Sequence, residues 1–259
     1  IKAQADYLRE ARALEVRVVG LANSRQMLLQ EDGIDLEHWK TLLEDSDTPM
    51  NMHDFVNRMN QMNLSNSVFV DNTASDQITD YYESILDASI SISTPNKIAT
   101  SSAYLKYERL KNIARRRGVL FRYETNVGAG LPVIGTLNDL TTSGDRIRKI
   151  EAVLSGSLSF IFNNFDSSAS FSAIVREARE KGYTEPDPRE DLGGFDVRRK
   201  LVILAREAGI PLEPEQVDIT PILPAACREA ADVDTFFAEL EKADDHFTGL
   251  VRQAEDENK

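Results

Sequence analysis

Apolar segments of strand length alternate with helical patterns in the middle of this chain, and the alternation leaves few folds open. Strands are predicted at 67–71, 88–93 and 119–123, with helices at 73–85 and 102–117 between them. When a strand, a helix and a second strand follow one another, the second strand usually returns parallel to the first through a right-handed crossover. The sequence therefore predicts a doubly wound α/β architecture with a parallel sheet.

The flanking regions add helices and two more strands. Upstream, the sequence predicts a helix over 1–12, a strand over 15–22, and helical patterns near 36–43 and 51–62. The pattern changes after residue 125, where we place a boundary between two domains. Downstream, a strand is expected at 146–154. The remaining segments have helical patterns, at 133–140, 158–165, 170–181, 196–208, 233–242 and 245–257.

Composition excludes several functional classes. A chain of 259 residues with 41% hydrophobic residues predicts a globular protein. Its formal charge of −13 disfavours nucleic acid and anionic membranes as partners. With neither a membrane-length apolar run nor a basic leader, the sequence predicts a cytoplasmic protein. One cysteine and three scattered histidines disfavour a disulfide or structural zinc. Because a helical pattern starts at Ile1 with no N-cap before it, we expect a piece of a longer protein.

Polar residues follow two of the predicted strands, in the segments 71–75 and 94–97. Ligands of open parallel sheets bind beyond the carboxyl ends of the strands. The hydroxyls of Thr73 and Ser75 and the N–H groups of the next helix could bind a nucleotide phosphate, and Lys97 adds a cation at the same edge. The alternatives are a plain capping turn and a solvated lysine.

The turn at 124–132 contains two glycines, which permit unusual backbone angles. Its closely spaced carbonyl oxygens could coordinate a hard monovalent cation, and the alternative is a hinge between domains. The turn is not a dinucleotide-binding fingerprint, because Val133 stands where the third glycine would be.

The segment 182–200 concentrates the most chemistry. It carries five carboxylates in or next to a proline-containing loop, and it places Asp196 and Lys200 one helical turn apart on the same face. Burying a carboxylate costs several kcal/mol unless a cation pairs with it. A lysine held beside carboxylates is a candidate general acid. The alternative is an ordinary helical ion pair that contributes about 0.3–0.5 kcal/mol.

Taken together, these motifs resemble homoserine dehydrogenase, and especially the dehydrogenase portion of bifunctional aspartokinase/homoserine dehydrogenases. The resemblance covers nearly the whole chain and rests on the segments 71–75, 94–97, 125–132, 154–161 and 182–200. It implies NAD(P)-dependent interconversion of L-homoserine and L-aspartate 4-semialdehyde in threonine and methionine biosynthesis. It also implies a Rossmann-type sheet, joined to an α+β substrate domain, and a homo-oligomer.

The resemblance also implies a role for individual residues. Lys200 would be the proton donor, with Asp196 orienting it and Lys97 sharing in proton transfer. Glu185 and Asp191 would bind homoserine. The cofactor-binding residues would be Thr73, Ser75, Lys97 and Arg25, and Arg25 favours NADP over NAD because it could accept a 2′-phosphate. A sodium or potassium ion would be bound by Glu124, Val127, Ala129 and Leu131.

By the same resemblance, residues 1–125 would form a partial dinucleotide-binding domain. Residues 126–259 would form the substrate-binding and catalytic domain with part of the dimerisation region. The family's first strand and glycine-rich loop would precede Ile1, and its returning segments would follow Lys259. We therefore expect the 259-residue segment alone to bind a dinucleotide weakly or not at all. Two other functions stay open, a different semialdehyde reductase and a non-catalytic association fragment of a bifunctional chain.

Overall fold

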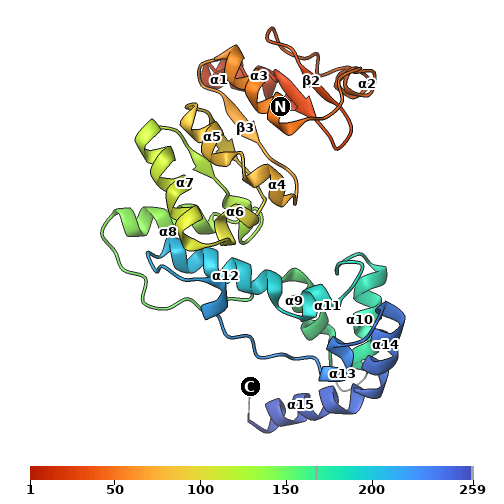
Figure 1. Ribbon diagram of the computed structural model, residues 1–259. Coiled ribbons are helices and arrows are strands. Elements are labelled where there is room, and N and C mark those ends of the chain that lie inside the picture. The colour runs from red at the N-terminus through yellow and green to blue at the C-terminus, as the bar shows by residue number, and fades with distance from the viewer. Residues whose placement is uncertain (167–168, 258–259) are drawn as a thin grey trace. The chain divides into compact units, whose positions relative to one another are not determined.

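A computed structural model describes residues 1–166 and 169–257, which form two compact units (Figure 1). The first unit comprises Ile1–Asp71, Ser75–Ser93 and Arg109–Arg122. The second comprises Asn72–Ala74, Thr94–Glu108 and the chain from Tyr123 onward. Among the described residues, no helix combines the length and apolar character needed to cross a bilayer.

The first unit contains the predicted parallel sheet. Its strands are β3 (Val68–Val70), β4 (Ser91–Ser93) and β5 (Phe121–Arg122), in the order β3-β4-β5. Both neighbouring pairs are parallel, with Phe69 opposite Ile92 and Ile92 opposite Phe121. The helices α5 (Tyr82–Asp87) and α7 (Tyr104–Arg117) make the crossovers between these strands. The prediction of a parallel α/β arrangement is therefore confirmed.

Buried apolar side chains join this sheet to its helices. Ile85 and Leu86 of α5, Ile92 of β4 and Leu110 of α7 are fully buried. Tyr82 packs edge-on against Phe121, with ring centroids 5.8 Å apart.

The helix predicted over 73–85 is interrupted. It is replaced by α4 (Asp76–Thr79) and α5, and the N–H groups of Asp80 and Tyr81 donate to carbonyls three residues earlier. Such bonds tighten the turn and end the α-helical ladder. Tyr82 is buried directly after the break, and its hydroxyl donates to the Asp71 carboxylate over 2.6 Å.

The strand predicted over 15–22 is wrong in extent. Only β1 (Gly20–Ala22) is regular, and it pairs antiparallel with β2 (Met27–Leu29) in a separate two-stranded sheet. Residues 18 and 19 bond irregularly to the segment after β2, through Ile34 N–H to the Val18 carbonyl and Gln30 N–H to the Val19 carbonyl. The chain therefore turns back in a hairpin directly after β1. The helices around it are η1 (Lys2–Gln4), α1 (Ala5–Arg12), α2 (Trp39–Glu44) and α3 (Met52–Met62).

In its described residues, the second unit is built from helices alone. The strand predicted at 146–154 is wrong, because a strand needs a neighbour for its backbone N–H and C=O groups and no other described segment of this unit is a strand. The helices are α6 (Ile98–Ser101), η2 (Glu124–Asn126), α8 (Val133–Thr142), α9 (Gly156–Asn164), α10 (Phe171–Glu180), α11 (Arg189–Leu192), α12 (Phe195–Glu207), η3 (Pro214–Gln216), α13 (Ala225–Arg228), α14 (Val233–Lys242) and α15 (Asp244–Asp256).

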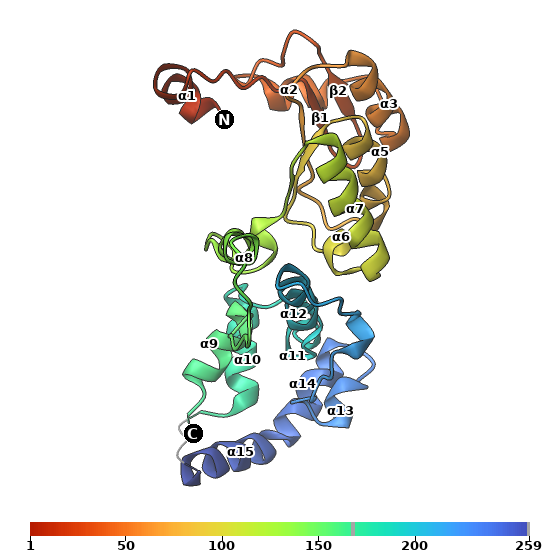
Figure 2. The same ribbon diagram turned by 90° about the vertical axis from the view of Figure 1, so that its left-hand side faces the viewer.

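An apolar cluster of buried side chains holds α9, α10 and α13–α15 together. Figure 2 shows the ribbons of these helices. At its centre, the rings of Phe171 and Phe247 stack with centroids 3.8 Å apart. Side-chain caps start three of these helices. Ser155 accepts from Leu158 N–H, Ser170 from Ala173 N–H and Asp232 from Thr235 N–H. The predicted capped helix at 170–181 is confirmed as α10.

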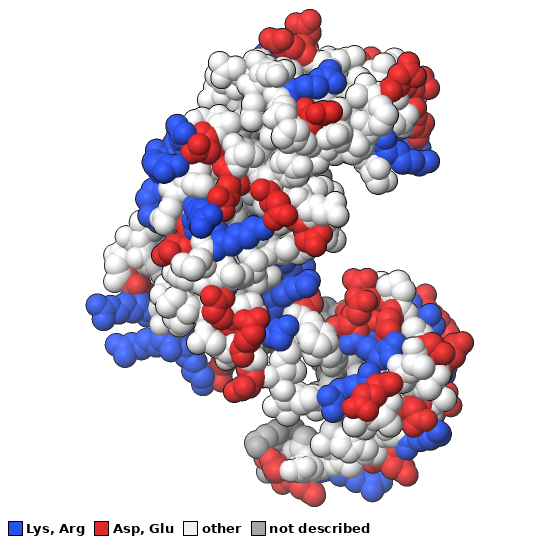
Figure 3. Space-filling view, in the orientation of Figure 1, with Lys and Arg blue, Asp and Glu red and all other residues white. Residues whose placement is uncertain are grey.

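On the face drawn in Figure 3, acidic and basic side chains lie close to one another over both units. The net negative charge is therefore not gathered into one patch on this face. Most ion pairs among the described residues are exposed, such as Arg176 with Glu241 at 2.7 Å. Exposed pairs of this kind stabilise a fold little.

Candidate active site

The helix α12 carries two of the predicted catalytic residues. Two glycines precede it, and Gly194 is its N-cap with φ of 73°, a left-handed conformation that glycine adopts without strain. A Cβ on Gly193 would lie 2.7 Å from the Arg189 carbonyl oxygen, so only glycine fits there. The later turns of α12 are buried at Val202, Ile203 and Leu204. The residues of its first turns, 195–200, are exposed or half-buried.

A carboxylate bridges two ammonium groups at the start of α12. Asp196 Oδ2 lies 2.7 Å from Lys200 Nζ, and Asp196 Oδ1 lies 3.3 Å from Lys97 Nζ. Lys200 also donates to the Leu154 carbonyl over 2.6 Å. The Lys200 side chain is only 16% exposed, compared with 29% for Lys97 and 45% for Asp196. We call these three residues the lysine–aspartate cluster.

Two opposing effects act on the Asp196 carboxyl. Partial burial alone would raise its pKa, but the hydrogen bond from Lys200 and the positive charges of Lys97 and Lys200 outweigh burial and lower the pKa below its ordinary value. The carboxylate is therefore ionised at neutral pH. With two cations and one anion, the cluster can stabilise an oxygen atom that gains negative charge, and it can donate a proton to that oxygen.

Lys97 enters the cluster from a different segment. It is the N-cap residue of α6, after the turn that follows β4. Side chains shape this turn, since the Thr94 hydroxyl accepts from Asn96 N–H and the Asn96 side chain accepts from Ile98 N–H. The prediction that the segment 94–97 places a cation beyond a strand end agrees with this arrangement.

The predicted homoserine ligands lie before α12, Glu185 in a loop and Asp191 in α11. The Asp191 carboxylate accepts from the Ser157 hydroxyl over 2.7 Å and from the Glu185 backbone N–H over 2.8 Å. Glu185 itself is exposed. Within the described part of the chain, no hydrogen bond or ion pair joins either residue to the lysine–aspartate cluster.

The residues predicted to bind the cofactor lie in two loops. Ser75 is the N-cap residue of α4, and Thr73 lies two residues before it, exposed. Arg25 is exposed in the turn between β1 and β2, where its backbone N–H donates to the Asn23 side chain. The hairpin at Arg25 was not predicted from the sequence.

The turn predicted to bind a cation contains the cap of a helix. Both oxygens of the Glu124 carboxylate accept N–H bonds of 2.8 Å, from Ile134 and Gly135, at the start of α8. The carboxylate therefore caps this helix. Both oxygens of this predicted cation ligand are thus engaged in hydrogen bonds within the protein. Val127 is buried, Ala129 is left-handed with φ of 50°, and the Leu131 carbonyl accepts from Val133 N–H.

Two buried charged residues of α12 were missed at the sequence level. Glu207 is 5% exposed and accepts hydrogen bonds from Tyr107, Tyr123 and Asn138. Burial and the Glu207 charge raise the pKa of both tyrosines. Its neighbour Arg206 is equally buried. The available signal was an Arg-Glu pair directly after five apolar residues, 201–205, in a helical pattern.

Comparison with known proteins gives a consistent result along the chain. A family model described as homoserine dehydrogenase matches residues 132–259. Another, described as homoserine dehydrogenase, NAD binding domain, matches residues 1–124. The bifunctional aspartokinase/homoserine dehydrogenase of Haemophilus influenzae is 42% identical over 259 residues, which cover all of this chain and 32% of that protein.

Two solved structures have the same fold. A Candida auris protein of unknown function has a TM-score of 0.88 and 34% identity, covering 98% of this chain and 74% of that one. A hyperthermophilic archaeal homoserine dehydrogenase in complex with NADPH has a TM-score of 0.65 and 24% identity, covering 84% and 71%. The chain spans about a third of the length of the bifunctional relative. On the two family models, which together match nearly every residue, the chain belongs to the homoserine dehydrogenase family.

Proposed function

We propose that the protein containing this chain interconverts L-homoserine and L-aspartate 4-semialdehyde with NADP, or with NAD, as cofactor. The observation that carries the proposal is the lysine–aspartate cluster, in which two cations from separate segments meet one carboxylate. Family membership supplies the reaction class. In a biosynthetic setting, the product would serve threonine and methionine synthesis.

In the proposed mechanism, Lys200 donates a proton to the aldehyde oxygen as that oxygen becomes an alkoxide. Asp196 holds the Lys200 ammonium by the 2.7 Å contact, and the Leu154 carbonyl holds it from another side. Lys97 adds a second positive charge near the same oxygen and can share in the proton transfer. Preorganised charges of this kind stabilise the transition state more than the ground state. The nicotinamide, when bound, supplies the hydride.

Glu185 and Asp191 are proposed to bind the ammonium group of homoserine. A carboxylate and an ammonium form a charge-assisted hydrogen bond, which is stronger than one between neutral groups. The bonds from Ser157 and the Glu185 backbone fix the Asp191 carboxylate. Glu185 is exposed and open to a ligand.

For the cofactor, we propose that Thr73, Ser75 and Lys97 bind near the nicotinamide half and that Arg25 binds the 2′-phosphate of NADP. The archaeal relative solved with NADPH supports the choice of a nicotinamide dinucleotide. A sodium or potassium ion in the turn at 124–132 is part of the same proposal. We further propose a homo-oligomer, with residues 1–125 serving the cofactor and residues 126–259 the substrate.

The proposal is tested by measuring initial rates with the full chain that carries this segment. L-Homoserine, L-serine and L-threonine are compared as substrates, each with NADP+ and with NAD+. We expect NADP+ or NAD+ reduction with homoserine and background rates with the other two. Comparable turnover of a different hydroxy-amino acid would favour another reductase of semialdehydes. A folded protein that leaves homoserine unchanged would favour an association role.

A further inference from the structure

Arg206 is the most deeply buried cation of α12 near the proposed active site. It lies ten residues after Asp196 on the same helix, and its side chain is 0% exposed. A charged group so placed is costly unless hydrogen bonds satisfy it. Burial lowers the pKa of Arg206, and the neighbouring Glu213 carboxylate opposes that change.

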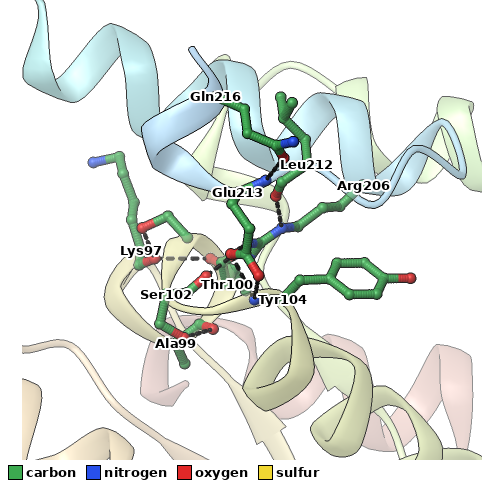
Figure 4. Close-up of polar contacts among 10 residues, drawn as sticks. Lys97, Ala99, Thr100, Ser102, Tyr104, Arg206, Leu212, Glu213 and Gln216 are labelled. Atoms are coloured by element: carbon green, nitrogen blue, oxygen red, sulfur yellow. Dashed lines mark hydrogen bonds and ion pairs between the residues drawn. The ribbon is translucent and has the colours of Figure 1, made fainter.

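The guanidinium of Arg206 donates to three backbone carbonyls, which belong to two segments of the chain (Figure 4). Nη1 donates to the Thr100 carbonyl over 2.8 Å, and Nη2 donates to the Ser102 carbonyl over 2.6 Å. Nε donates to the Leu212 carbonyl over 3.0 Å. The first two acceptors are the third residue of α6 and the residue after its end. Arg206 therefore ties α6 to the later part of α12.

Glu213 strengthens this attachment. Its carboxylate lies 3.4 Å from Arg206 Nη2 and accepts from the Tyr104 backbone N–H over 2.9 Å. The Glu213 backbone N–H in turn donates to the Gln216 side chain over 2.7 Å. The chain immediately after α6 is thus held by the same charge pair.

The attachment reaches Lys97 through the single turn of α6. The Thr100 hydroxyl donates to the Lys97 carbonyl over 3.0 Å, and the Ser101 hydroxyl donates to it over 2.8 Å. The side-chain amide of Asn126, itself fully buried, lies 2.8 Å from the Thr100 hydroxyl. Figure 4 shows the Lys97 side chain extending away from Arg206, on the far side of this turn. The backbone of Lys97 is therefore fixed, while its ammonium is free to reach Asp196.

We propose that Arg206 is a positioning residue, which holds α6 against α12 so that Lys97 stays in contact with Asp196. The inference rests on the proposed function and adds to it a residue that touches neither substrate nor cofactor. In this view α12 contributes to the lysine–aspartate cluster twice. Asp196 at its start belongs to the cluster, and Arg206 near its end holds the segment that carries Lys97. The closed path runs from Asp196 along α12 to Arg206, through α6 to Lys97, and back to Asp196.

Arg206→Lys tests the proposal because lysine keeps the charge but lacks the planar fork that reaches several carbonyl oxygens. We expect kcat/KM for homoserine to fall about tenfold or more, since small misplacements of a catalytic group reduce rates strongly. Glu207→Gln is the matched control. It changes the adjacent buried residue of α12, which accepts hydrogen bonds from Tyr107, Tyr123 and Asn138. We expect it to lower the melting temperature and to change kcat/KM about twofold at most.

A double-mutant cycle separates positioning from a general loss of structure. If Arg206 acts through Lys97, then Arg206→Lys changes kcat/KM less than about twofold in a Lys97→Ala background. An equal loss in both backgrounds would overturn the proposal. If Arg206→Lys does not fold, Glu213→Gln replaces it in the cycle, with a smaller effect in the same direction.

A second readout needs no activity. The Asp196 carboxyl carbon is titrated by NMR in the protein and in its variants. Because the Lys97 charge lowers the Asp196 pKa, Arg206→Lys should raise that pKa, and Lys97→Ala should raise it and abolish any further effect of Arg206→Lys. An unchanged Asp196 titration in Arg206→Lys would contradict the proposal. If the Asp196 titration shifts as expected but the protein does not turn homoserine over, the proposed function is refuted and the positioning role of Arg206 stands.

Discussion

Asp187 shows how a carboxylate of the loop before α12 is committed to structure. The Arg189 guanidinium donates to both Asp187 oxygens, with Nε 2.9 Å from Oδ1, and it also donates to the Ala230 carbonyl. The Arg189 hydrogen bonds lower the pKa of the Asp187 carboxyl, against a smaller raising effect of burial. Asp187, one of the five carboxylates of the segment 182–200, is thus paired with a nearby cation.

Asp187→Asn should therefore destabilise the protein in a pH-dependent way. At pH 7 we expect a loss of about 1 kcal/mol in the free energy of unfolding, which is typical of a partly buried, bidentate ion pair. A carboxyl whose folded-state pKa lies below its unfolded value, about 3.9, stabilises the fold fully above that value. This stabilisation is lost as the pH falls through the folded-state pKa. The difference between the two proteins should consequently close in acid.

The measurement is urea unfolding of both proteins at a series of pH values from neutral to acid. Asp139→Asn, which changes an exposed carboxylate of α8, is the control. A difference between Asp187→Asn and the parent that persists undiminished in strong acid would contradict the ion-pair explanation.

The elements that the sequence predicted well are those with a local cause. The helices α3, α7, α8, α10, α12, α14 and α15 all lie close to their predicted ranges, because apolar periodicity and caps act within a few residues. The strand expected at 146–154 failed for a non-local reason. Its side-chain pattern is compatible with a strand, yet pairing depends on a neighbour that the pattern does not reveal.

The start of α12 depends on Gly194, the N-cap residue of this helix. Gly194 has φ of 73°, so an alanine there would be strained. We expect Gly194→Ala to lower the free energy of unfolding by about 1 kcal/mol or more. Gly249→Ala is the opposite case, because Gly249 lies inside α15 with open space where the alanine Cβ would lie. It should raise stability by about 0.5–1 kcal/mol.

Thermal or urea unfolding of the two glycine variants checks this pair of predictions. We expect the free energy of unfolding to fall in Gly194→Ala and to rise in Gly249→Ala, although both variants replace a glycine by alanine. A Gly194→Ala protein as stable as Gly249→Ala would show that α12 does not need a left-handed residue at its N-cap.

The parallel sheet and the lysine–aspartate cluster differ in how much of them the sequence could predict. The alternation of strands and helices along the chain was enough to predict the parallel sheet, because crossovers between parallel strands are almost always right-handed. Helical spacing alone placed Asp196 beside Lys200. Resemblance was needed to connect Lys97 with them, because 99 positions separate Lys97 from Asp196.

Neither the sequence pattern nor the family resemblance predicted the hydrogen bonds of Arg206. It joins a guanidinium to backbone carbonyls more than a hundred positions away, and any residue can supply a carbonyl. No side-chain pattern marks such an acceptor. The Asp191 bond to Ser157 was hidden for the same reason, since a serine hydroxyl has many possible partners.

Replacing Lys200 by alanine, in the full chain that carries this segment, decides between a catalytic cluster and a structural ion pair. Lys181→Ala is the matched control, because Lys181 forms the same i,i+4 pair with Glu177 at 2.6 Å on α10. We predict that Lys200→Ala lowers kcat for homoserine by about 10²–10⁴-fold with a melting temperature close to that of Lys181→Ala, which keeps its activity. A Lys200→Ala protein that loses turnover only in proportion to its loss of folding, or that turns homoserine over at the parent rate, would contradict the proposed role of Lys200.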